Sequence, residues 1–190
     1  MENENKINKL KIDIQKLKEF NKKYKTDFKI SDTRISFYCL NKGNQVFDIL
    51  NSFTFPKLEN LDLRCNQLKS IDLLSKTHLE QLKVLNLSEN DIEKIDQLSN
   101  CDIKNLEELL LFKNKLTSID SLSNCSFKKL KLLNVSNNSL TSINIDIFLS
   151  LPELEILNLS ENFLKNNEIF GKEKIFVNLK KLYLSRNEIM

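Results

Sequence analysis

The sequence repeats itself every 24 residues, and this repeat restricts the fold more than any other feature of the chain. Six segments fit the pattern L-x-x-L-x-L-x-x-N-x-L, with Val or Ile replacing Leu in three places. A repeat of this length is typical of a solenoid, because one unit cannot bury its apolar face without neighbouring units. The six segments are 58–68, 82–92, 106–116, 130–140, 154–164 and 179–189.

The alternation of apolar and polar residues within each segment predicts a short strand with one buried face. In the first segment, Leu61 and Leu63 would point inward, and Asn60 and Asp62 outward. We therefore expect an α/β fold, a curved solenoid or horseshoe with a concave parallel β-sheet. The rest of each unit would return on the convex side as loops, 3₁₀ turns or short helices.

One asparagine stands at the same inward position of every segment. A buried amide needs hydrogen bonds, and the connecting loop offers backbone groups for them. The pattern predicts a structural ladder of asparagines without a catalytic role. Its members are Asn66, Asn90, Asn114, Asn138, Asn162 and Asn187.

These segments resemble the leucine-rich repeat family, in its intracellular form with 24-residue repeats, over about residues 34–190. The resemblance implies a protein-interaction module whose concave face binds a protein or peptide. It also implies a scaffold or regulatory subunit, as in phosphatase regulators, axonemal dynein light chains and splicing scaffolds. The expected location is the cytoplasm, with the nucleus and the cilium as alternatives.

The chain divides into three parts. Residues 1–33 would form an N-terminal amphipathic helix and a connector, 34–57 a degenerate capping repeat, and 58–190 six repeats, the last one incomplete. In the capping repeat, we align Phe37 with Leu61 and Cys39 with Leu63. This alignment puts Lys42 at the place of the ladder asparagine.

The N-terminal helix has apolar residues at spacings of three and four and is rich in lysine. Residues 1–25 hold eight lysines against four acidic residues. Such a helix could cap the first turn, dock on a partner or a second copy as a coiled coil, or lie on an anionic membrane. Its acidic residues and short apolar stripe make the membrane the weakest of the three interpretations.

The chain stops at Met190, within the sixth repeat. The last strand would expose apolar core, so we expect either a fragment of a longer array or a surface for a partner or self-association.

The four cysteines form no C-x-x-C pair. We expect reduced thiols, in agreement with the cytoplasmic location. Cys101 and Cys125 would stack in adjacent turns, where apolar packing is favoured over a disulfide.

The sequence offers no chemistry for catalysis. His78 is the sole histidine, and two glycines are too few for phosphate-binding loops. We expect no enzyme activity, cofactor, metal site or small-molecule substrate. Acidic and basic residues balance on the strand positions, which argues against nucleic-acid binding.

An apolar patch on the concave face is the predicted partner site. The third repeat breaks a run of polar residues with Leu110 and Phe112. Large apolar patches mark contact sites, although Phe112 could also simply cover neighbouring aliphatic side chains. The candidate residues are Val84, Leu110, Phe112, Leu132, Ile156, Tyr183, Glu108 and Lys113. An alternative function is recognition within a larger enzyme, such as a kinase or a ubiquitin ligase.

Overall fold

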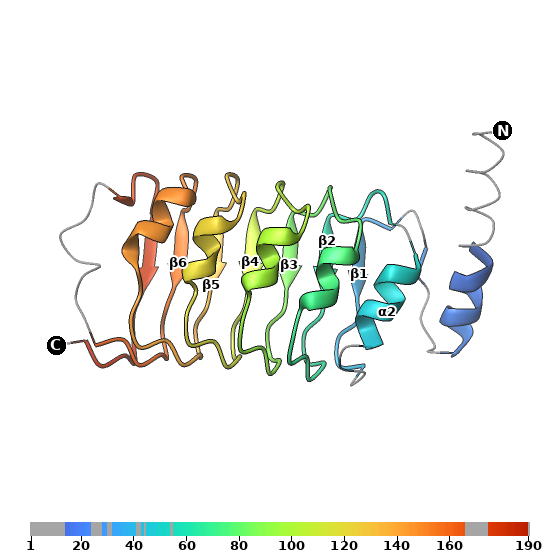
Figure 1. Cartoon of the computed structure of the whole chain (residues 1–190), viewed down its shortest axis with the longest axis horizontal. Coiled ribbons are helices and arrows are strands. Elements are labelled where there is room, and N and C mark those ends of the chain that lie inside the picture. The colour runs from blue at the N-terminus through green and yellow to red at the C-terminus, as the bar shows by residue number, and fades with distance from the viewer. Residues whose placement is uncertain are drawn as a thin grey trace.

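A computed structural model shows the predicted solenoid and confirms the fold class. The structure describes residues 14–23, 28–29, 32–40, 43, 45–53, 55–165 and 175–189. Seven parallel strands form one sheet in chain order (Figure 1). The strands are β1 (Arg34–Ser36), β2 (Asn60–Asp62), β3 (Val84–Asn86), β4 (Glu108–Leu110), β5 (Leu132–Asn134), β6 (Ile156–Asn158) and β7 (Lys181–Tyr183).

Short helices return the chain on the opposite side of the solenoid from the strands (Figure 1). The first is α2 (Gln45–Ser52), and the next three are the 3₁₀ helices η1 (Asp72–Lys76), η2 (Asp96–Asn100) and η3 (Asp120–Asn124). Each of these three follows an inward isoleucine and buries one leucine, so the apolar repeat of the sequence explains their regular stacking. A longer 3₁₀ helix, η4 (Ile145–Ser150), buries Ile145, Ile147 and Phe148.

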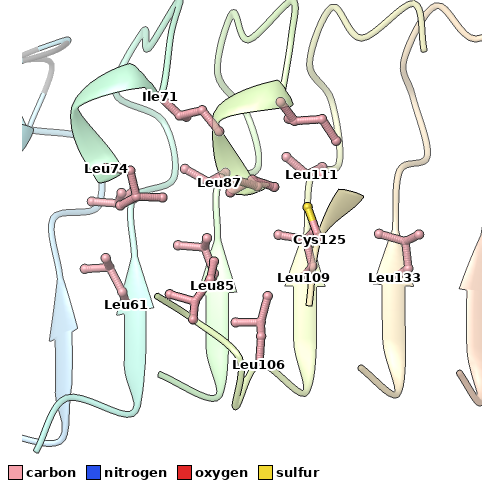
Figure 2. Packing of buried hydrophobic residues seen from close by; sticks show 14 of the residues in the cluster. Leu61, Ile71, Leu74, Leu85, Leu87, Leu106, Leu109, Leu111, Cys125 and Leu133 are labelled. Carbon is pink, nitrogen blue, oxygen red and sulfur yellow. The ribbon is translucent and has the colours of Figure 1, made fainter. Parts of the chain in front are cut away.

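The core is one continuous cluster that fills the space between strands and helices. The central residues of the inner strands, Leu61, Leu85, Leu109 and Leu133, stack from turn to turn and are fully buried (Figure 2). Each buried leucine contributes about 1.5–3 kcal/mol of transfer free energy. No single turn can form this core, so the turns stabilise one another.

The inward asparagines satisfy the backbone of the loops beside them. The Asn138 amide nitrogen donates to the carbonyls of Leu111, Val135 and Ser136 at 3.0–3.2 Å. Its Oδ1 accepts from the Leu116 backbone N–H of the preceding turn at 3.0 Å. The amide therefore joins two turns where the peptide groups lack strand partners.

The residue before each of these asparagines adopts a left-handed conformation, although none of them is a glycine. Such a conformation costs a non-glycine residue about 1–2 kcal/mol, which the hydrogen bonds of the adjacent asparagine offset. The φ angles lie between 54° and 58° at Cys65, Glu89, Lys113, Asn137, Glu161 and Arg186.

The first turn has a different register from the one predicted. Ile35 pairs with Leu61, so Phe37 is equivalent to Leu63 and Cys39 to Cys65. The predicted alignment of Phe37 with Leu61 was wrong by two residues, because this turn is two residues longer and returns through an α-helix. Leu40, not Lys42, therefore takes the place of the ladder asparagine.

A disulfide joins Cys39 to Cys65. The prediction of four reduced thiols was wrong for this pair, because the 26-residue register places two cysteines side by side on adjacent turns. Cys101 and Cys125 are free, Cys125 being buried and Cys101 partly buried. This agrees with the apolar packing that we expected for them.

The N-terminal helix, described over residues 14–23, packs against the first turn. Leu17 and Phe20 are buried, and the Phe20 ring lies 6.1 Å from the rings of Phe28 and Phe53. The Phe28 ring in turn contacts Phe37 at 4.9 Å. The apolar stripe of this helix therefore covers the β1 end of the core (Figure 1).

The β7 end is more open. Leu182 and Leu184, which occupy inward positions, are only partly buried, whereas their equivalents in the inner strands are fully buried.

Candidate protein-binding face

The outward side chains of the strands form what we call the strand face. Two rows of residues run across it from strand to strand, set by the parallel register. The first row contains Arg34, Asn60, Val84, Glu108, Leu132, Ile156 and Lys181. The second row contains Ser36, Asp62, Asn86, Leu110, Asn134, Asn158 and Tyr183.

Four of the predicted site residues form a cluster at the middle of this face. Leu132 and Ile156 are register partners on β5 and β6, and Leu110 lies diagonally next to Leu132 on β4. Phe112 follows two residues after Leu110. All four are half-buried, so neighbouring side chains cover part of the surface that the sequence suggested would be exposed. We call Leu110, Phe112, Leu132 and Ile156 the apolar cluster.

The other predicted residues lie around this cluster. Val84 is separated from the apolar cluster, because Glu108 lies between Val84 and Leu132 in the first row. Tyr183 is 46% exposed on β7, and two asparagines separate it from Leu110 in the second row. Lys113 pairs with Glu89 at 3.6 Å beside Phe112. The structure therefore brings Glu108 and Lys113 to the cluster and leaves Tyr183 outside it.

Ion pairs between adjacent turns border the strand face where the strands begin. Acidic and basic residues alternate along this border and pair at N–O distances of 2.8–3.0 Å. The hydrogen bond from Lys131 holds the pKa of Glu107 below its ordinary value. We did not predict these pairs, although the alternation could have been read from the repeat. They are Glu59–Lys83, Glu107–Lys131 and Glu155–Lys180.

A second group of polar residues lies at the β1–β2 corner. Arg64 donates to both carboxylate oxygens of Asp62, at 2.7–3.2 Å, and its guanidinium lies 5.0 Å from the Tyr38 ring centroid. Burial raises the pKa of Asp62, but the hydrogen bonds from Arg64 outweigh this effect and hold it below the ordinary value. Both charges are therefore already satisfied within the chain.

The described residues contain no group of three side chains that could hold a metal ion. His78 is largely exposed and lies 3.6 Å from Glu80, at the start of a turn far from the apolar cluster in sequence. Within the same described residues, no helix is long and apolar enough to cross a membrane.

Several solved structures are similar to this chain. An internalin of Listeria monocytogenes is 25% identical with a TM-score of 0.59, over 76% of this chain and 46% of the internalin. A leucine-rich repeat protein of Leptospira interrogans is 30% identical with a TM-score of 0.62, over 74% of this chain and 34% of that one. The ectodomain of an Arabidopsis thaliana receptor kinase, in complex with Casparian strip integrity factor 2, is 28% identical with a TM-score of 0.58.

The match to the plant ectodomain covers 74% of this chain but only 16% of the ectodomain chain. This chain spans about half of the internalin and a smaller share of the other two proteins. No curated protein sequence matches it. The leucine-rich repeat family matches residues 56–116 and 104–164, which together make up more than half of the sequence. The chain therefore belongs to the leucine-rich repeat family.

Proposed function

We propose that the chain is a non-catalytic interaction module that binds a protein or peptide on its strand face. The apolar cluster is the observation that supports this proposal. Four large apolar side chains stay partly exposed on a surface whose other side chains are mostly polar or charged. Such a patch is typical of a contact site, and aromatic residues in such patches are typical binding hot spots.

The proposed role is that of a scaffold or regulatory subunit. Membership of the leucine-rich repeat family supports it, because this family generally provides interaction modules. Recognition within a larger protein is the second candidate, because the chain spans less than half of three similar solved proteins. Docking on a membrane is less favoured, since Leu17 and Phe20 of the basic helix are buried against the solenoid.

We infer an oxidising compartment in place of the cytoplasm expected from the sequence. The Cys39–Cys65 disulfide supports this inference, because reducing compartments keep such pairs as thiols.

Truncation of Phe112 tests the proposed function. The partner is first captured with the wild-type chain and identified by mass spectrometry, and its affinity is then measured by titration. Phe112→Ala should weaken binding by at least about 1–2 kcal/mol without lowering the thermal unfolding midpoint. The matched control is Phe163→Ala, which removes a ring that is 50% exposed outside the strand face. Unchanged affinity in Phe112→Ala would contradict the proposal.

A further inference from the structure

Most charged side chains of the strand face and its borders are already paired within the chain. The pairs are Glu59–Lys83, Asp62–Arg64, Glu89–Lys113, Glu107–Lys131, Glu155–Lys180 and Glu161–Arg186. Three charges differ from the rest. In the described part of the chain, Arg34, Glu108 and Lys181 form no ion pair.

These three charges lie in one row and at equal intervals. The register places all of them in the first row of the strand face, with Glu108 on β4 and the two basic residues on β1 and β7. Each basic residue is therefore three strands from Glu108. At about 4.8 Å between neighbouring strands, the interval is about 14 Å. The row thus carries a positive, a negative and a positive charge that pair with no other described side chain.

Glu108 is the most informative of the three because of its surroundings. Its register neighbours are apolar, Val84 on one side and Leu132 on the other, and Leu110 of the apolar cluster follows on the same strand. Glu108 is half-buried, whereas Arg34 and Lys181 are exposed. A partner that covered the apolar cluster would remove more water from this carboxylate. An unpaired charge in such an interface is costly, so a bound partner must supply an opposite charge.

We propose that the partner is an extended segment that crosses the strands and places a Lys or Arg side chain on Glu108. This proposal rests on the function proposed above. Apolar side chains two positions from the basic residue would point to the same face and lie on the apolar cluster. An extended chain rises about 3.3 Å per residue, so 14 Å corresponds to about four residues. Acidic residues about four positions to either side of the basic one would then reach Arg34 and Lys181. The charge pattern is symmetric and holds for either chain direction, whereas the apolar residues precede or follow the basic one according to that direction.

Selection of peptides tests the charge pattern without knowledge of the natural partner. Random twelve-residue peptides displayed on phage are panned against the wild type, Glu108→Lys and Asp120→Lys. Asp120 is exposed on η3, at the opposite side of the solenoid, so its variant carries the same change in net charge away from the strand face. Wild type and Asp120→Lys should select a basic residue with apolar residues two positions away and acidic residues about four positions away. Glu108→Lys should select an acidic residue in place of the basic one.

Affinities of a synthetic peptide with the wild-type consensus make the test quantitative. Glu108→Lys should weaken its binding by at least about tenfold, and the neutral variant Glu108→Gln by less. Replacing the basic residue of the peptide by Glu should restore binding to Glu108→Lys. Identical consensus sequences from wild type and Glu108→Lys, or no consensus from the wild type, would overturn the inference.

Phe112→Ala separates this inference from the proposed function. If wild-type peptides lose affinity for Phe112→Ala but not for Glu108→Lys, the strand face binds peptides and the charge inference is wrong. If neither variant changes peptide binding, both proposals are wrong.

Discussion

The first turn and the inner turns are fastened to their neighbours in different ways. Between inner turns, an asparagine amide donates to loop carbonyls and accepts a backbone N–H from the turn before. Between the first and second turns, the Cys39–Cys65 disulfide adds a covalent bond, while phenylalanine rings pack the N-terminal segment and the first turn together. Leu40 occupies the ladder position of the first turn, so this turn has no ladder asparagine of its own.

One buried atom marks the boundary between the two regions. Asn66 donates to the carbonyls of Phe37, Leu63 and Arg64 at 2.8–3.0 Å, but its Oδ1 has no hydrogen-bond partner among the described residues. The backbone N–H of Leu40, at the ladder position of the first turn, donates to the Phe37 carbonyl at 3.3 Å. The comparison shows that Asn66 keeps the donor bonds of a ladder asparagine beside the longer first turn but lacks the acceptor bond, and that a disulfide joins the same two turns.

Removal of a ladder asparagine should have the largest effect and should differ between the two regions. Asn138→Ala leaves several buried backbone groups without partners, at a cost of about 4 kcal/mol in the free energy of unfolding. Asn66→Ala should cost about 2 kcal/mol, because its Oδ1 makes no hydrogen bond that could be lost. Urea unfolding followed by circular dichroism measures both.

Asn158→Ala serves as the control for these two variants. Asn158 lies on the strand face, and its Oδ1 accepts from the Ser160 N–H at 3.1 Å. Its loss should cost less than about 1 kcal/mol. An equal cost for Asn66→Ala and Asn138→Ala would remove the distinction between the two regions.

Loss of the disulfide should have the second-largest effect and should act on the first turn. The bond spans 26 residues in sequence, and constraint of the unfolded chain by such a loop contributes about 3 kcal/mol. We expect the double variant Cys39→Ser, Cys65→Ser to unfold at lower urea concentration and to be cut first near α2 by limited proteolysis. Titration of denatured wild type should find two free thiols before reduction and four after it. Four thiols before reduction would show that the bond does not form.

The inner turns could be predicted from the sequence because the same constraint recurs in each of them. Leu61, Leu85, Leu109 and Leu133 recur at intervals of 24 residues, and each recurrence supports the register of the others. The first turn occurs once, so no second copy could correct the alignment of Phe37. On the strand face, the outward positions followed directly from the register. The extent to which Leu110 and Phe112 are exposed did not follow from the register, because it depends on how neighbouring side chains pack.

The smallest expected effect concerns the cysteines of the inner turns, which should behave unlike those of the first turn. Burial raises the pKa of the Cys101 thiol to about 11, and burial together with the nearby Cys101 raises that of Cys125 to about 12. The thiolate is the reactive form, so at pH 8 only roughly one Cys101 in a thousand can react. We expect iodoacetamide to alkylate both thiols in the folded protein at least about 100-fold more slowly than in urea.

The same shifts give the expected pH dependence of stability. The folded state holds these two protons more tightly than the unfolded state, whose thiols have a pKa of about 9.0. Their contribution is complete below pH 9 and is lost as the pH rises through 11 to 12. The double variant Cys101→Ala, Cys125→Ala should lose less stability between pH 8 and pH 10 than the wild type. Rapid alkylation of the folded protein at pH 8 would contradict the protection that burial is expected to give both thiols.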